Sequence, residues 1–133
     1  MGHRVGWQTR GMADIAASLV GRAFRVVEID GVPVLEEPVA DLTFGDDGRV
    51  TGCATINRLF GPYSLTGDEL TAGPLAGTMM AGPPEAMEQE QRLHAALSQP
   101  LTVSVSESGD RVELRGTVGV ALVLAPDDRV ELI

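Results

Sequence analysis

The stretch LTVSVSESGDRVELRGTVGVALVLA, residues 101–125, decides the fold class. Apolar and polar residues alternate in 101–107 and again in 111–116. The loop between these runs, SGD at 108–110, contains a glycine and has the length of a hairpin loop. The third run, 118–125, is apolar on both faces, which is typical of a central strand that is covered on both sides. The stretch therefore predicts successive antiparallel strands.

The same alternation recurs on both sides of this stretch. Polar turns separate the runs, and GDDG at 45–48 is the clearest of them, because Asp and Gly tolerate a tight or left-handed backbone. Another turn, TGDE at 66–69, separates Leu65 from Leu70. Turns at roughly 10–20-residue spacing favour an antiparallel meander or a partial barrel. The further strand-like runs are 23–29, 39–44, 49–56 and 129–133.

One segment, PPEAMEQEQRLHAALSQP at 83–100, departs from this pattern. It is rich in helix-forming residues and has prolines at both ends. Pro84 suits the first turn of a helix, and Glu85 favours its positive end. Pro100 marks the stop. The sequence predicts a main helix at about 84–99 that packs across the sheet and covers one of its faces or openings.

These patterns predict an α+β fold that is mostly β. A curved antiparallel sheet or partial barrel carries one main helix, at about 84–99, packed against it. The chain has 133 residues, which suits one domain. We assign residues 21–133 to that domain and residues 1–20 to an N-terminal arm. A short apolar segment in the arm, 13–20, fits a second helix that ends at Gly21.

The charge balance excludes several function classes. The formal net charge is −9, and all ten basic residues are Arg. The lack of Lys removes a phosphate-loop lysine and a Schiff-base lysine. Nucleic acid and anionic membrane surfaces repel an acidic domain, so we expect neither as a partner. No run approaches the roughly 18 apolar residues of a membrane-spanning helix.

The metal-binding residue types are few. Cys53 is the only cysteine, so an internal disulfide and a multi-cysteine zinc site are excluded. The two histidines, His3 and His94, are far apart. We therefore expect no metal and no cofactor, and we interpret Cys53 as a small buried filler. The lack of a secretory signal and the single cysteine favour a cytoplasmic location.

Several motifs occur in an order that resembles the META domain family, which includes the HslJ-like bacterial heat-shock proteins. The resemblance runs from Gly21 to about Pro126. Its helix pattern includes Glu90, Leu93, Ala96 and Leu97. The matching stretches are GRAFRVVEIDGVPV (21–34), LTFGDDGRVTG (42–52), NRLFGPY (57–63), GPLAGTMMA (73–81) and VELRGTVGVALVL (112–124).

The departures from the family pattern concern cysteines. Where the family often has Cys before the Asn of its motif, this chain has Ile56, and where it often has Cys after Met-Ala, this chain has Gly82. The resemblance implies that the two family cysteines are partners. Their joint absence here fits a reducing compartment.

The resemblance implies a small, non-enzymatic, stress-related domain, although family members are often associated with the cell envelope. We expect a binding or protein-interaction module that uses an exposed strand edge. The alternative is a carrier of a small apolar ligand in a cavity enclosed by the sheet. An enzyme is not expected, since His94 and Glu90 are the only acid–base candidates. The sequence leaves the oligomeric state open.

Three polar residues of the NRLFGPY motif are candidates for the functional site. Asn57, at the close of a strand, is expected to satisfy backbone groups in a turn or to face a ligand. Tyr63 is expected to anchor a core edge, with its hydroxyl bonded to the backbone. Arg58 is expected to pair with an acid.

The remaining candidates are Thr78, Met79 and Met80. They line a pocket if the adaptable methionine side chains face a ligand. In the alternative interpretation, alternate residues of this strand point into the core. The carrier hypothesis requires that Met79 and Met80, together with Leu59 and Phe60, line a void rather than fill a core.

Overall fold

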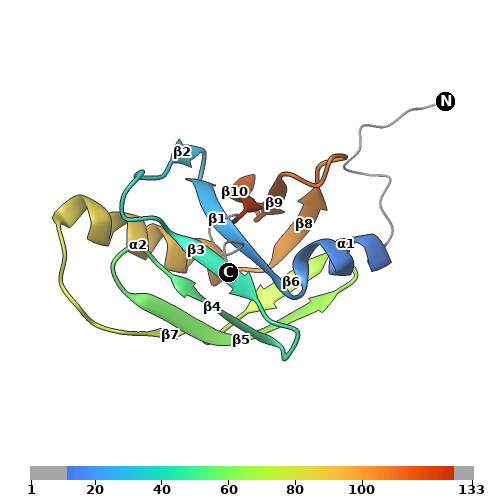
Figure 1. Cartoon of the computed structure of the whole chain (residues 1–133), viewed down its shortest axis with the longest axis horizontal. Helices are drawn as coiled ribbons and strands as arrows, with labels where there is room; N and C mark the ends of the chain where they lie inside the picture. Colours follow the sequence, from blue (N-terminus) through green and yellow to red (C-terminus); the bar gives the residue numbers. More distant parts are fainter. Residues whose placement is uncertain (1–11, 128–133) are drawn as a thin grey trace.

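The computed structural model describes residues 12–127, which contain ten strands and two helices (Figure 1). The elements in chain order are α1 (Met12–Leu19), β1 (Arg22–Ile29), β2 (Val32–Pro33), β3 (Asp41–Phe44), β4 (Arg49–Cys53), β5 (Arg58–Thr66), β6 (Glu69–Ala72), β7 (Ala76–Gly77), α2 (Pro84–Leu97), β8 (Leu101–Val105), β9 (Val112–Arg115) and β10 (Val120–Pro126). No helix among the described residues is long and apolar enough to cross a membrane.

Eight of the strands form a closed antiparallel barrel in the order β1-β3-β4-β5-β6-β8-β9-β10. The barrel closes where β1 pairs with β10, with Phe24 opposite Pro126 and Ile29 opposite Leu122. The short strands β2 and β7 lie outside this ring and pair with β1 and β5. The expected mostly-β fold is found, but the sheet closes completely, because β1 has a partner on each side, β3 and β10.

The barrel interior is filled by side chains. Alternate residues of strands such as β3, β8 and β9 are buried, as the sequence alternation predicts, whereas β10 buries adjacent residues, Ala121 with Leu122 and Leu124 with Ala125. An eight-stranded barrel is just wide enough for its own side chains. Phe24 and Phe44 meet edge to face, with ring centroids 6.3 Å apart. The other large interior side chains that are almost fully buried include Leu42, Leu59, Leu70, Leu101, Leu114 and Leu122.

The two helices lie at opposite ends of the barrel (Figure 1). At one end, Ile15 and Leu19 of α1 belong to the same core cluster as the barrel side chains. At the other end, α2 buries Leu93, Ala96 and Leu97 against the barrel. The main helix lies where the sequence predicts it, although it ends at Leu97, two residues before the predicted boundary. The predicted 13–20 helix is α1.

The sequence pattern missed β5, the longest strand. Gly61 and Pro62 interrupt the alternation there, but both belong to the strand. An ideal Cβ on Gly61 would lie 2.6 Å from the carbonyl oxygen of Pro74, so glycine allows the chain before β7 to approach β5. The predicted strand 49–56 ends at Cys53, because the chain turns there. The predicted run 129–133 lies outside the described residues.

Candidate functional site

The turn between β4 and β5 is fastened to α2 by one buried carboxylate, that of Glu90. Its Oε1 accepts hydrogen bonds from the backbone N–H groups of Ile56 and Asn57, both at 2.9 Å. Its Oε2 accepts a third, at 2.7 Å, from Nδ2 of Asn57. The carboxylate thus accepts one hydrogen bond from each of two backbone N–H groups and one from the side-chain amide of Asn57, so its own buried oxygens have partners.

The side chain of Asn57 in turn holds the segment that follows β7. Its Nδ2 donates to the carbonyl oxygen of Met80 at 2.9 Å, and its Oδ1 accepts from the N–H of Met80 at 2.6 Å. Oδ1 also accepts from the hydroxyl of Thr78 at 2.9 Å. Asn57 therefore imitates a peptide group, as predicted, but its backbone partners lie in a segment more than twenty residues away rather than in its own turn.

Gln89 forms a second attachment beside Glu90. Its Nε2 donates to Oγ1 of Thr55 at 2.9 Å, and its Oε1 accepts from the N–H of Leu35 at 2.8 Å. Thr55 has a φ of 138°, a conformation that a β-branched residue rarely adopts. The hydrogen bonds of Gln89 and Glu90 therefore hold a strained turn in place.

The surroundings of Glu90 lower its pKa from the ordinary value of 4.5. Burial acts to raise the pKa, but the hydrogen bonds from Asn57 and Ile56 and the nearby charge of His94 outweigh it. The carboxylate is therefore the form that the fold stabilises.

This pKa shift predicts a pH dependence of stability. Because the folded-state pKa is below the unfolded-state value, the contribution of Glu90 is complete above 4.5 and is lost as the pH falls through the folded-state pKa. We expect the free energy of unfolding, measured by urea titration, to fall less steeply with acidification in Glu90→Gln than in the wild type. Parallel curves would contradict this prediction.

Asn57, Gln89 and Glu90 and their hydrogen bonds are called the clamp below. Beside the clamp lies an open groove of about 550 Å³ between the 77–81 segment and α2. Apolar surface dominates its lining. Met79 and Met80 are 94% and 59% exposed, and Met87 and His94 line the groove from the α2 side. Asn57 and Glu90 of the clamp also border it. A second hollow, of about 670 Å³ at the α1 end, is more polar.

The outer edge of β7 borders the same region. The N–H of Thr78 donates to the carbonyl oxygen of Arg58 at 3.1 Å, and Met80 bonds to Asn57, so these peptide groups face β5. By the alternation of an antiparallel ladder, the peptide groups of Gly77 and Met79 face the opposite edge. Among the described residues, β7 pairs with β5 alone. This edge is therefore open to a further strand.

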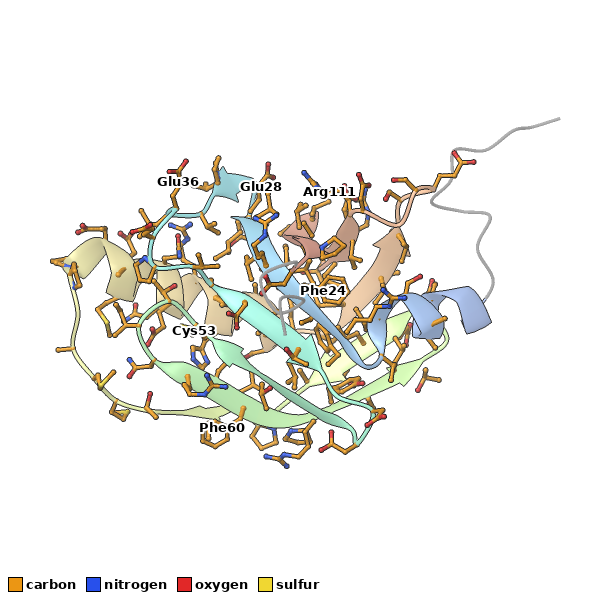
Figure 2. All side chains as sticks on the ribbon, in the orientation of Figure 1. Phe24, Glu28, Glu36, Cys53, Phe60 and Arg111 are labelled. Carbon is orange, nitrogen blue, oxygen red and sulfur yellow. The ribbon has the colours of Figure 1, made fainter. Side chains whose placement is uncertain are left out.

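The structure brings together Asn57, Thr78 and Met80 of the predicted site, with Met79 beside them. Met79 and Met80 are exposed and do not point into the core. The alternative interpretation of this segment, in which alternate residues point into the core, is therefore wrong. Leu59 is fully buried, whereas Phe60 is 37% exposed and projects away from the barrel (Figure 2). A void lined by Met79, Met80, Leu59 and Phe60 therefore does not exist, because these side chains lie on different sides of the sheet.

Tyr63 and Arg58 lie outside this cluster. The hydroxyl of Tyr63 donates to the carbonyl oxygen of Gly45 at 2.7 Å, the predicted bond to the backbone. Its ring meets Phe44 edge to face, 5.3 Å between centroids, so Tyr63 anchors the β3–β4 turn. Arg58 is exposed, and within residues 12–127 its guanidinium forms no ion pair, contrary to the prediction.

Cys53 is half-buried rather than fully buried, and its thiol donates to the carbonyl oxygen of Thr55 at 3.4 Å. Sequence reasoning considered Glu90 only as an acid–base candidate and a family helix residue, and it missed Gln89. One signal was available: Glu90 lies on the side of the predicted helix that carries Ala86, Leu93 and Leu97. An acid on an apolar face needs donors.

A comparison of the sequence with models of known protein families gives a match. The family model of the META domain matches residues 17–129. The chain belongs to the META domain family. No curated protein matches the chain in sequence. The match begins inside α1 and includes every strand of the barrel, so the clamp and groove are features of this META domain.

Two solved structures share the fold of this META domain. An NMR structure of a protein from Burkholderia xenovorans has a TM-score of 0.70 at 20% sequence identity, with 97% of each chain covered. A second NMR structure has a TM-score of 0.68 at 24% identity and covers 86% of this chain and 96% of its own. At these identities the likeness establishes the architecture.

The fold also brings Ile56 and Gly82 together, the two positions where the family resemblance implies partnered cysteines. An ideal Cβ on Gly82 would lie 2.7 Å from Cγ1 of Ile56 and 3.0 Å from its Cδ1. The Ile56 side chain therefore occupies the space beside position 82. In this META domain the contact at positions 56 and 82 is apolar, and the polar contact between the turn and this segment is made by Asn57.

Proposed function

We propose that this META domain is a non-enzymatic binding module that holds an extended, apolar segment of a partner protein. The observation that carries the proposal is the open outer edge of β7 beside a groove lined by methionines. An extended segment would pair with the peptide groups of Gly77 and Met79, and its alternate side chains would enter the groove.

The character of the groove supports an apolar occupant. Methionine side chains adapt to different apolar shapes, and such residues are frequent on surfaces that bind protein segments. A volume of about 550 Å³ lies within the usual range of binding pockets. The net charge of −9 favours a partner with basic residues around the apolar segment, because opposite charge speeds encounter.

The proposal excludes catalysis at this groove on chemical grounds. Both oxygens of Glu90 accept hydrogen bonds from the fold, so this carboxylate is not poised to take a substrate proton. His94 also borders the groove, but the hydroxyl of Thr78, another lining residue, donates to Oδ1 of Asn57 and accepts from the N–H of Arg58, so the fold already uses it. The large side chains packed in the barrel core favour this binding module over the carrier alternative. The stress-related role implied by the family remains part of the proposal.

A defined probe tests this function. A phage-displayed library of random peptides is panned on the purified domain, and the enriched peptides are synthesised. We expect extended apolar peptides whose NMR titration shifts the backbone amides of 76–81 and α2. N-methylation at alternate peptide positions should weaken binding, since it removes ladder hydrogen bonds. Enrichment of no peptide, or shifts confined to another face, would overturn the proposal.

We also predict that a charge placed in the groove weakens peptide binding. In Met80→Glu, the carboxylate must lose water to enter an apolar site, which weakens affinity by at least about tenfold, or about 1.4 kcal/mol. The matched control is Val118→Glu, an equally polar change at a residue that is 96% exposed and outside the groove. Equal affinities of the two variants for an enriched peptide would contradict the prediction.

A further inference from the structure

The methionines of this chain are distributed unusually. Of the five, Met1 and Met12 belong to the first twelve residues, and the other three, Met79, Met80 and Met87, all line the groove. Among the side chains that the structure describes, none of the buried core residues is a methionine. Methionine ordinarily fills gaps in a core, so this placement is not explained by packing.

An imidazole lies in the same groove. Met87 and His94 are seven residues apart on α2 and therefore lie two turns apart on one face of the helix. Glu90 lies between them, about one turn from each. Met80 lies across from this face, because its backbone is bonded to Asn57 and Asn57 is bonded to Glu90. The clamp thus brings the 79–80 segment to the part of α2 that carries the imidazole.

We propose that Met79, Met80, Met87 and His94 form a binding site for monovalent copper. Thioether sulfur is a soft ligand that selects Cu(I), and imidazole also suits copper. Met side chains are long and flexible, so three of them can converge on an ion at an open groove. No group of three or more His, Cys, Asp or Glu side chains within residues 12–127 could hold a metal ion, so a harder divalent cation lacks a comparable donor set there.

The negative net charge of the chain favours the binding of a cation. The chain carries a formal net charge of −9, which raises the local concentration of positive ions. The copper site goes beyond the proposed peptide function, although both use the same groove. A bound ion would occupy part of the surface that the apolar segment needs.

The test measures Cu(I) binding to the purified domain in the presence of ascorbate, by competition with the chromophoric chelator bicinchoninate. The parent protein carries Cys53→Ser, because a thiol also binds Cu(I). We expect the parent to take up Cu(I) and not Zn²⁺. The combined variant Met79→Leu, Met80→Leu and Met87→Leu should bind at least about tenfold more weakly, as should His94→Gln.

Leucine conserves the volume and apolar character of methionine, so the combined variant should keep the fold, which circular dichroism checks. Met12→Leu, which changes a methionine that is not one of the proposed ligands, is the matched control and should bind like the parent. The proposal is overturned if the parent does not compete with the chelator, or if the combined variant binds as tightly as Met12→Leu. Peptide binding is measured on protein without added metal, so the two proposals fail separately.

Discussion

Replacing Glu90 with Ala should destabilise the domain by about 3 kcal/mol or more, a large part of the total stability of a domain of this size. The loss has a specific cause: the N–H groups of Ile56 and Asn57 lose their acceptor, and Nδ2 of Asn57 loses one of its two acceptors and keeps the carbonyl oxygen of Met80. Each unsatisfied buried donor costs about 1–3 kcal/mol, although water that enters the space would recover part of this. Urea titration followed by circular dichroism measures the change.

Two further variants distinguish the effect of losing the Glu90 carboxylate from the effect of any acid-to-alanine change on α2. Glu90→Gln keeps an oxygen for the two backbone N–H groups but places an NH₂ against Nδ2 of Asn57, so an intermediate loss is expected. Glu88→Ala alters an exposed acid on the same helix and should change stability by less than about 0.5 kcal/mol. If Glu90→Ala matched Glu88→Ala, the clamp would have no energetic role.

The second large effect is a gain in stability. We expect the double variant Ile56→Cys, Gly82→Cys to form a disulfide on mild oxidation, because Cγ1 of Ile56 lies where the partner sulfur would sit, 2.7 Å from the Cβ position of residue 82. Closing a loop of roughly 26 residues stabilises a protein by about 3–4 kcal/mol in the chain-entropy model. Urea titrations of the oxidised and the reduced variant give the difference directly.

The single variants provide the control. Gly82→Cys beside an intact Ile56 should be less stable than the wild type, because its Cβ would meet Cγ1 and Cδ1 of Ile56 at or below the closest normal approach. Ile56→Cys alone should lose packing without this overlap. A double variant that keeps two free thiols under oxidising conditions would show that the two positions are not held together.

Much of the fold was accessible from the sequence because the barrel is a meander. Its strands alternate between apolar and polar residues, and most neighbours in the chain are neighbours in the sheet. The closure of the barrel was not accessible. The pairing of Phe24 with Pro126 joins distant parts of the chain and leaves no local signal. Strand β5 was missed because Gly61 and Pro62 break the alternation, although the contact with Pro74 requires a small residue there.

The candidate site was predictable only in part, for the same reason. Asn57, Thr78 and Met80 were named from their place in motifs, yet which groups they bond depends on α2 and the 76–81 segment lying side by side. Glu90 looked like one of several acids on a helix. Its three hydrogen-bond donors come from residues more than thirty positions earlier. The sequence of the helix itself therefore gives no sign of them.

The seam between β1 and β10 has a kinetic consequence. Along most of the ring, adjacent strands can zip together as the meander grows, whereas the seam joins segments about a hundred residues apart and carries a large loop-closure entropy until the rest of the ring is in place. The seam is therefore expected to form late in folding. Until then β1 and β10 each expose an unpaired edge, and the open ring is the species most prone to associate with other chains.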